Sequence, residues 1–325
     1  MAEGKGLVCV TGAGGFVASW LVKSLLERGY NVRGTVRDPD NEKKTSHLKA
    51  LPGAKERLEL VRADLLVDGS FDAAVSGCDG VFHTATPVVA IKEDPKAEMI
   101  DPAVNGTLNV LKSCAKTTSV KRIVMTSSSS AARFRTDYAT NPLLDETSWS
   151  DLEFCTKFKM WYAVAKTTAE KAAWDFSEKN NLNLITILPT FIIGPVLPSE
   201  LSSTSTDVLD LLTGHEKKFQ LYGRMGYIHI DDVATVHILA YETPGASGRY
   251  ICSEGERDNT EVGELLKVRY PNLNVATRFE KGGMPYYNFD VKKVKELGLT
   301  SFKSFDVMFD DAIESYRNLN LLPTP

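Results

Sequence analysis

Short continuous runs of apolar residues alternate, over the first 190 positions, with stretches whose apolar residues recur every three or four positions. Residues 7–10 (Leu-Val-Cys-Val) form such a run, and Phe16, Trp20, Leu21 and Leu25 then follow at helical spacing. A continuous run indicates a strand buried on both faces, and the recurring spacing indicates an amphipathic helix. This stretch therefore predicts a strand, a glycine-containing turn and a helix.

The same alternation continues to residue 188. Further strands are predicted at 31–36, 58–61, 80–84, 122–126 and 184–188, and helices at about 41–51, 97–115 and 161–179. Strands that alternate with helices pair in parallel and carry the helices on both faces of the sheet. The predicted fold class is therefore α/β, a doubly wound parallel sheet of the Rossmann type.

The rhythm changes after Pro189. A stretch rich in proline and serine leads into shorter elements, including a helix that begins near Asp231 and a strand at 248–252. We expect residues 1–189 to form the main domain and residues 190–325 mainly a smaller C-terminal lobe. Segments near 228–252 are expected to return to the main domain.

Composition excludes several classes of protein. The 325 residues are 43% hydrophobic and 25% charged, and 38 basic against 42 acidic side chains give a net charge of −4. This balance lacks the basic footprint of a nucleic-acid binder, and no apolar run approaches the ~20 residues that span a bilayer. The five cysteines form no CxxC pair and the five histidines no metal-ligand pattern, so we expect a cytoplasmic protein without a metal.

The turn after the first predicted strand carries a glycine pattern that suits a dinucleotide. Gly12, Gly15 and Ala18 form G-x-x-G-x-x-A where the strand gives way to the helix. Small residues there let the backbone approach a pyrophosphate at the helix N-terminus, so Gly12, Gly15, Phe16 and Val17 are predicted to bind a cofactor. The alternative is a tight turn whose small residues serve packing only.

The residues after the second predicted strand indicate which dinucleotide is bound. NADH-binding proteins usually place an acidic residue there for the ribose 2′-hydroxyl, whereas this strand is followed by Arg37, with Lys43 and Lys44 beyond it. A guanidinium pairs with a 2′-phosphate and an ammonium adds charge, so NADPH/NADP+ is the predicted cofactor. Asp38 argues for NADH instead, and the two lysines alternatively form a solvated helix face.

Asp64 and Leu65 follow the third predicted strand and are further cofactor candidates. The Asp64 carboxylate suits the adenine amino group, and its structural alternative is a helix cap.

A tyrosine and a lysine four positions apart supply candidate chemistry. Tyr162 and Lys166 begin a predicted helix and share one of its faces, and Ser128 lies in a serine run directly after the fifth predicted strand. Because open parallel sheets bind ligands at the carboxyl ends of their strands, the three residues are predicted to converge. Ser127 and Ser129 are alternatives to Ser128.

These residue types suit the reduction of a carbonyl group. Hydride transfer to a carbonyl carbon leaves charge on the oxygen, which needs a hydrogen-bond donor and then a proton. A free phenol, with a pKa of about 10, gives up its proton more readily beside an ammonium that stabilises the phenolate. Tyr162 is the predicted acid, Lys166 its partner and Ser128 the donor. The structural alternatives are a core tyrosine beside a solvated lysine, and a serine turn.

Several segments resemble a group of plant reductases among the extended short-chain dehydrogenases, which includes dihydroflavonol, cinnamoyl-CoA, vestitone and tetraketide α-pyrone reductases. The likeness covers nearly the whole chain and rests on VCVTGAGGFVASW, GTVRDPDNEKK, KRIVMTSSSSA, WYAVAKTTAEKAAW and GYIHIDDVATVH. The resemblance implies further cofactor contacts, namely Thr84, Ala85 and Thr86 along the ribose and Pro189 and Ile192 at the nicotinamide.

Within this group, TSSSSAARFR, FKMWYAVAK and STSTDVLDLL look most like tetraketide α-pyrone reductases, which implies a polyketide ketone as substrate. Arg133, with Arg135 nearby, is a candidate to bind the acidic enol oxygen of a hydroxypyrone, although a surface pair of arginines is the alternative. An apolar wall for the ring, or alternatively plain core, is predicted from Phe191, Tyr222, Met225 and Tyr227.

The leading hypothesis is a cytoplasmic, NADPH-dependent carbonyl reductase acting on a ketone of a plant polyketide or phenolic, with residues 190–325 mainly binding this small-molecule substrate. We expect no nucleic-acid partner, no membrane span, and a loose association with other enzymes of its pathway. A cinnamoyl-CoA ester, a dihydroflavonol or an aromatic aldehyde is the alternative substrate. A non-catalytic NADP-binding regulator and a nucleotide-sugar epimerase are alternatives from other classes.

Overall fold

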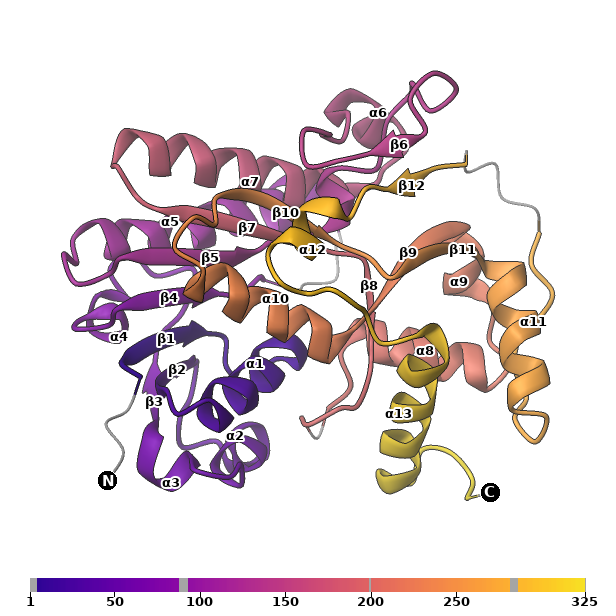
Figure 1. The fold of residues 1–325 in the computed structure, drawn as a ribbon, viewed down its shortest axis with the longest axis horizontal. Coiled ribbons are helices and arrows are strands. Elements are labelled where there is room, and N and C mark those ends of the chain that lie inside the picture. Colours follow the sequence, from indigo (N-terminus) through magenta and orange to yellow (C-terminus); the bar gives the residue numbers. More distant parts are fainter. Residues whose placement is uncertain (1–4, 88–92, 199, 281–285, 325) are drawn as a thin grey trace.

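The computed structural model of the protein describes residues 5–87, 93–198, 200–280 and 286–324. At its centre lies a seven-stranded parallel sheet (Figure 1). Its strands are, in spatial order, β10 (Gly248–Cys252), β7 (Leu184–Pro189), β5 (Arg122–Thr126), β4 (Gly80–His83), β1 (Leu7–Thr11), β2 (Asn31–Val36) and β3 (Leu58–Arg62). The predicted α/β fold with a parallel sheet is confirmed.

Helices cover both faces of this sheet, because each connection between parallel strands crosses over one face. One face carries α5 (Asp101–Ala115) and α7 (Trp161–Lys179), and the other carries α1 (Phe16–Glu27) and α10 (Ile230–Glu242) (Figure 1). The remaining helices of this part are α2 (Glu42–Lys49), α3 (Ala54–Arg57), α4 (Asp72–Val75), the π-helical turn η1 (Lys96–Ile100), the 3-10 turn η2 (Ser129–Ala131), α6 (Leu152–Lys157) and α12 (Lys292–Glu296).

The predicted helix at 97–115 is divided between η1 and α5. Pro102, in the first turn of α5, has no N–H to donate to the carbonyl four residues earlier, which explains why regular α-helical bonding begins only beyond residue 100.

A second group of elements forms the C-terminal lobe. Its three-stranded sheet contains β8 (Phe191–Ile193), β9 (Arg224–His229) and β11 (Gly255–Asp258), with β9 in the middle. Around it lie α8 (Ser203–Leu212), α9 (Lys217–Tyr222), α11 (Asn259–Arg269) and α13 (Phe305–Asn318). Two short parallel strands, β6 (Leu143–Leu144) and β12 (Asn288–Phe289), form a third sheet.

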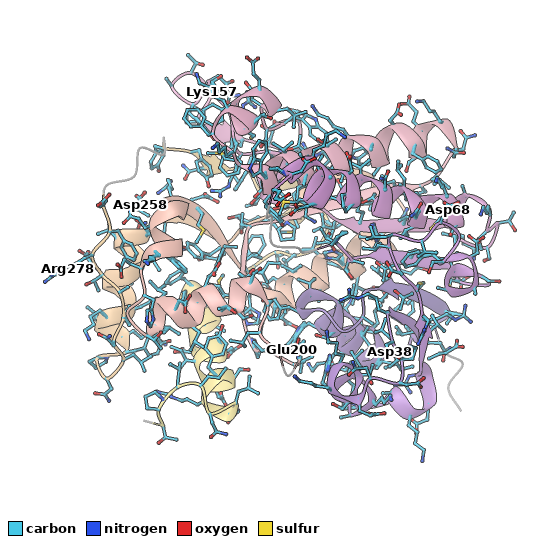
Figure 2. All side chains as sticks on the ribbon, turned by 180° about the vertical axis from the view of Figure 1, so that it is seen from behind. Asp38, Asp68, Lys157, Glu200, Asp258 and Arg278 are labelled. Carbon is cyan, nitrogen blue, oxygen red and sulfur yellow. The ribbon has the colours of Figure 1, made fainter. Side chains whose placement is uncertain are left out.

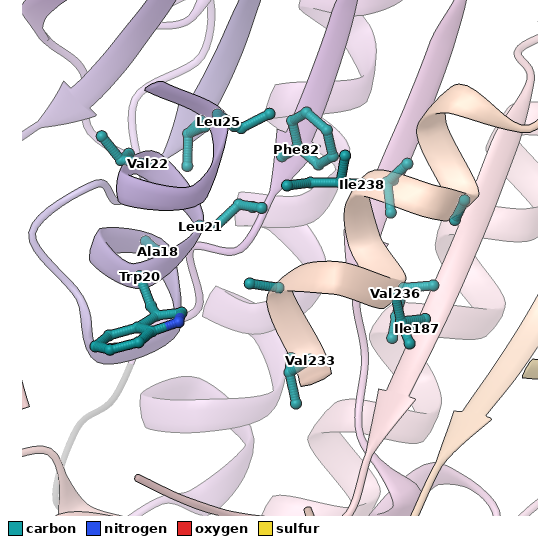
Figure 3. Packing of buried hydrophobic residues seen from close by; sticks show 14 of the residues in the cluster. Ala18, Trp20, Leu21, Val22, Leu25, Phe82, Ile187, Val233, Val236 and Ile238 are labelled. Atoms are coloured by element: carbon teal, nitrogen blue, oxygen red, sulfur yellow. The ribbon is translucent and has the colours of Figure 1, made fainter. Parts of the chain in front are cut away.

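The chain returns from this lobe to the main sheet. Helix α10 packs against α1, and β10 pairs in parallel with β7 at the edge of the seven-stranded sheet. Figure 3 shows Leu21 and Leu25 of α1, Ile238 of α10 and Phe82 of β4 in the core that results. A separate core, with Phe309 at 0% exposure, fills the C-terminal lobe. Figure 2, a view from behind, shows Asp258 and Arg278 at the end of the molecule away from Asp38.

The strand order reverses between β1 and β4, since β2 and β3 extend beyond β1 whereas β5, β7 and β10 extend beyond β4. A crevice at the carboxyl ends of the strands forms at such a reversal, and it is where open α/β sheets bind ligands. The glycine turn follows β1 and the serine run follows β5, so both candidate regions lie at this edge.

Close packing of β2 against the glycine turn yields a testable prediction. A Cβ atom at Gly34 would lie 2.8 Å from the Cβ of Ala13 and 3.1 Å from a methyl carbon of Leu60. We expect Gly34→Ala to lower the free energy of unfolding by about 1–3 kcal/mol, because a buried strand cannot take up the extra methyl without shifting. Urea denaturation measures this.

Gly245→Ala is the matched control, because its Cβ would meet nothing within 4 Å. Its unfolding free energy should stay within about 0.5 kcal/mol of the unsubstituted protein. Equal urea midpoints for the two variants would show that the Gly34 contact does not constrain the turn.

Candidate active site

The ends of β1 and β4 are tied together by the side chain of Thr11. Its hydroxyl oxygen accepts the N–H groups of Thr84 and Ala85, each at 3.1 Å, and lies 2.9 Å from Nδ1 of His83. Burial, with a smaller effect of the Lys166 charge, lowers the pKa of His83 to about 3, so its ring is neutral. Because the Thr11 oxygen already accepts two N–H groups, its own proton is the one shared with Nδ1. Two residues predicted to lie along the ribose are thus fixed beside the glycine turn.

The glycine turn has the shape that its sequence predicts. Gly12 has φ +66°, which favours glycine, and a Cβ there would lie 3.0 Å from that of Ala85. Gly15 precedes the first turn of α1, has no side chain with which to cap it, and is exposed, whereas Phe16 and Val17 are half-buried. The first N–H groups of a helix lack partners within the helix, so this end suits an anion.

The basic residues predicted to bind a 2′-phosphate lie at the end of β2 and on α2. Arg37, Lys43 and Lys44 are all exposed. A Cβ at Gly14 would lie 3.1 Å from the Lys44 carbonyl oxygen, so the start of α2 adjoins the glycine turn. Lys43 forms an ion pair with Glu200 at 3.4 Å.

Asp38, which argued for NADH, pairs with Arg62 at 3.3 Å. The loop after β3 is fastened locally. The Asp64 carboxylate accepts the N–H of Leu66 at 2.9 Å, so Asp64 caps a turn and does not cap a helix. The Leu65 carbonyl accepts a hydrogen bond from the Asn109 amide at 2.8 Å.

The tyrosine and lysine occupy opposite environments on one face of α7. Lys166 is 7% exposed, and its ammonium donates to Thr86 Oγ1 at 3.0 Å and to the Thr126 carbonyl at 3.4 Å. Tyr162 is 50% exposed, with its ring centroid 6.0 Å from the Lys166 ammonium. The structural alternative, a core tyrosine beside a solvated lysine, is therefore wrong.

The serine run separates into side chains with different partners. Ser127 donates to Glu170 Oε2 at 2.7 Å, on the side of α7. Ser128 accepts the N–H of Ser130 at 3.1 Å as the cap of η2, a bond that leaves its hydroxyl proton for another acceptor. Ser129 begins η2.

Residues proposed for the substrate lie where the main sheet passes into the C-terminal lobe. Arg133 is 8% exposed, so the alternative that it is a surface arginine is wrong. Its guanidinium donates to the Arg224 carbonyl at 3.2 Å and to the Tyr287 hydroxyl at 3.0 Å. Its buried Nε has no partner among the described residues. Arg135 instead forms a two-pronged ion pair with Asp137.

The predicted apolar wall belongs to the core of the C-terminal lobe. Phe191 of β8 pairs in register with Tyr227 of β9, and their ring centroids lie 5.9 Å apart. Met225 and Tyr227 are buried, burial raises the pKa of Tyr227, and its hydroxyl has no partner in the part of the chain that the structure describes. The Tyr222 side chain lies outside the described residues.

Pro189 and Ile192 lie on either side of the passage between the two sheets. Pro189 ends β7 opposite Cys252, and Ile192 of β8 pairs with Ile228 of β9. A single residue, Thr190, separates β7 from β8, so both positions lie at the carboxyl edge of the main sheet.

The buried charges next to the serine run are not predicted from the sequence. Glu170 of α7 and Arg249 of β10 form a buried ion pair at 2.8 Å. The spacing of Glu170, one helical turn after Lys166, was the available signal, but its partner lies 79 residues away and no local pattern indicates it.

The described residues contain no group of three or more histidine, cysteine, aspartate or glutamate side chains that could hold a metal ion. Within the same residues, none of the helices combines the length and apolar character needed to cross a membrane.

Residues 8–252 match the model of the NAD dependent epimerase/dehydratase family. The chain belongs to this family, and the sequence resemblance to its plant reductases is confirmed. It is 54% identical to tetraketide alpha-pyrone reductase 1 of Arabidopsis thaliana over 324 residues, which cover 100% of this chain and 99% of the relative.

Solved structures agree with this assignment. Vestitone reductase from alfalfa (Medicago sativa) superposes with a TM-score of 0.83 at 35% identity, covering 98% of this chain and 100% of that one. Yeast methylglyoxal/isovaleraldehyde reductase Gre2, complexed with NADPH, gives a TM-score of 0.79 at 26% identity, covering 97% and 100%.

A second histidine of this edge leads to a prediction about acid stability. His237 Nδ1 donates to the Val233 carbonyl and Nε2 accepts from the Thr126 hydroxyl, both at 2.7 Å, and burial lowers its pKa to about 4. Since a free histidine titrates near pH 6.5, the unfolded chain takes up the proton first. Stability should therefore fall as the pH drops from about 6.5 towards 4, by at most about 1.4 kcal/mol per pH unit for this residue.

His237→Gln removes this titration. Its unfolding free energy, measured in urea at pH 7.5 and 5.0, should depend less on pH than that of the unsubstituted protein. An unchanged difference between the two pH values would exclude His237 as a source of acid sensitivity.

Proposed function

We propose that the protein is an NADPH-dependent carbonyl reductase that reduces a ketone of a plant polyketide or phenolic to an alcohol, with a tetraketide α-pyrone as the substrate. The observation that carries the proposal is the pair on α7, a buried Lys166 ammonium beneath a half-exposed Tyr162 phenol at the carboxyl edge of the sheet. The 54% identity to a tetraketide alpha-pyrone reductase supports the choice of substrate.

The residues at the β1–β4 crevice fit NADPH. Gly12 leaves a space that a Cβ would fill against Ala85, and the exposed Gly15 opens the N-terminus of α1 to a pyrophosphate. Arg37, with Lys44 beside the glycine turn, supplies positive charge for the 2′-phosphate, and Asp38 is engaged by Arg62. The related reductase Gre2 was solved with NADPH. When bound, NADPH supplies the hydride.

Other cofactor contacts follow from the same edge of the sheet. We assign Thr84, Ala85 and Thr86 to the ribose and the segment from Pro189 to Ile192 to the nicotinamide. Phe16 and Val17 would line the pyrophosphate site, and Asp64 and Leu65 the adenine site. Hydrogen bonds and strand pairings described above anchor the backbone of the segments assigned to the ribose, the nicotinamide and the adenine.

The chain's own groups then handle charge and proton. Ser128 retains a hydroxyl proton with which to bind the substrate oxygen, and Tyr162 donates the proton that converts the alkoxide to an alcohol. The Lys166 ammonium stabilises the phenolate that Tyr162 becomes. Hydrogen bonds to Thr86 Oγ1 and to the Thr126 carbonyl hold the Lys166 ammonium in position near the Tyr162 ring.

The substrate would bind where the main sheet adjoins the C-terminal lobe. Arg133 Nε is a charged donor, buried and without a partner among the described atoms, which suits an anionic enol oxygen of a hydroxypyrone. Phe191 is half-buried and offers apolar surface on β8, while Met225 and Tyr227 belong to the buried core against which it packs. Cytosolic placement is part of the proposal, since all five cysteines are free thiols, as is loose association with enzymes that make the substrate.

A panel of carbonyl compounds tests the proposed function. Purified protein with NADPH is incubated with pyrones, dihydroflavonols, hydroxycinnamoyl-CoA esters and aromatic aldehydes, and kcat/KM is compared. The pyrones are expected to give the highest value. Turnover of another class with none of the pyrones would remove the substrate assignment and leave the reductase class standing.

Replacement of the proton donor tests the chemistry. Tyr162→Phe should lower kcat by about 10²–10⁴-fold, because the alkoxide loses its acid, while the Kd for NADPH, measured by fluorescence titration, stays within twofold. Undiminished turnover with normal NADPH binding would refute the catalytic assignment.

Removal of the guanidinium after β2 tests the cofactor choice. Arg37→Ala should raise KM for NADPH by about 10–100-fold and leave KM for NADH unchanged, because only the 2′-phosphate loses a charge-assisted bond. Lys55→Ala, an exposed basic residue on α3, is the control and should change neither value. Equal changes for the two cofactors would contradict the role of Arg37.

A further inference from the structure

A fully buried carboxylate lies one helical turn beyond Lys166. Glu170 accepts hydrogen bonds from Ser127 and Thr186, each at 2.7 Å, and from Arg249 Nε at 2.8 Å. These three donors come from the end of β5, from β7 and from β10. A buried charge with this number of bonds is costly to form, and the proton transfer described above does not use it.

Arg249 is itself fixed from several sides. Its guanidinium lies 3.8 Å from the centroid of the Trp149 ring, and it donates to the Glu146 carbonyl at 2.9 Å and to the Ser148 carbonyl. The ion pair therefore joins the returning strand β10 and the loop before α6 to the helix that carries Tyr162 and Lys166.

The end of β5 is held on both of its faces. Successive side chains of a strand point to opposite sides, and here Thr126 bonds His237 of α10 while Ser127 bonds Glu170 of α7. Ser128 is the next residue. The position of Ser128 relative to α7 is thus set by the 2.7 Å hydrogen bond from the preceding residue, Ser127, to Glu170 of that helix.

We propose that Glu170, held in place by Arg249, is a positioning residue that fixes Ser128 relative to Tyr162 and Lys166 by accepting the Ser127 hydroxyl. This inference rests on the proposed function. One rigid helix then carries the proton donor, its ammonium partner and the acceptor that locates the third catalytic group. Small displacements of such a group lower the rate steeply, because the reacting atoms must meet within a few tenths of an ångström.

Ser127→Ala is the first test. We expect kcat to fall about tenfold with the Kd for NADPH within twofold, and the isotope effect on kcat with NADPH deuterated at the transferred position to rise, because hydride transfer becomes slower than other steps. A loss of folded protein alone would not change the isotope effect.

Ser113→Ala is the matched control. Ser113 is equally buried and donates to the Asp72 carboxylate at 2.6 Å, but it lies on α5 away from the serine run. Its variant should keep the unsubstituted kcat and isotope effect. Ser127→Thr, which returns a hydroxyl, should regain most of the kcat that Ser127→Ala loses.

A double-mutant cycle separates positioning from direct catalysis by Ser127. Glu170→Leu and Ser127→Ala each remove the hydrogen bond between Ser127 and Glu170, so the double variant should have the kcat of the slower single variant. Losses that multiply, or a Ser127→Ala variant with unsubstituted kcat, would overturn the inference. If Glu170→Leu does not fold, because Arg249 is left unpaired, the comparison of Ser127→Ala with Ser127→Thr decides. Failure of the threonine to restore kcat in folded protein would then count against the positioning role of Glu170.

The outcome also separates this inference from the function on which it rests. Normal turnover by Tyr162→Phe would refute the reductase chemistry itself. An inactive Tyr162→Phe together with a fully active Ser127→Ala would refute only the positioning role of Glu170.

Discussion

The burial of one ammonium group determines how the site is put together. Lys166 is held by oxygen atoms from the ends of two strands, Thr86 after β4 and Thr126 of β5. An unpaired ammonium would not remain buried there, so α7 can dock on the sheet in only one position without losing these bonds. Tyr162, one helical turn earlier on α7, is half exposed.

The cofactor side depends on close backbone packing and not on charge pairs. Thr11 ties the β4 loop to the glycine turn through two N–H groups, and Gly34 lets β2 lie directly against Ala13. A neutral His83 accepts the remaining Thr11 proton without adding a charge to the site. The basic residues proposed to bind the 2′-phosphate, Arg37 and Lys44, lie exposed at the end of β2 and on α2.

The sequence predicted those features that local physics determines. Apolar runs located the strands of the main sheet, and the glycine turn and the Tyr-x-x-x-Lys spacing were assigned to a strand end and a helix face, where the structure has them. It could not predict that Lys166 is buried and Tyr162 exposed, because burial depends on strands far away in the chain. The burial of Arg133 and the Glu170–Arg249 ion pair could not be predicted for the same reason. The π-helical turn before Pro102 was not predicted, although the sequence shows the proline.

A crystal structure of the protein with NADP+ and the alcohol product tests the arrangement of the three groups. We expect the new hydroxyl of the product to lie within hydrogen-bond distance of both Tyr162 Oη and Ser128 Oγ, with the Lys166 ammonium still bound to Thr86 and to the Thr126 carbonyl. A product oxygen bound by other groups, with the Tyr162 hydroxyl turned to solvent, would contradict the catalytic roles proposed for these residues.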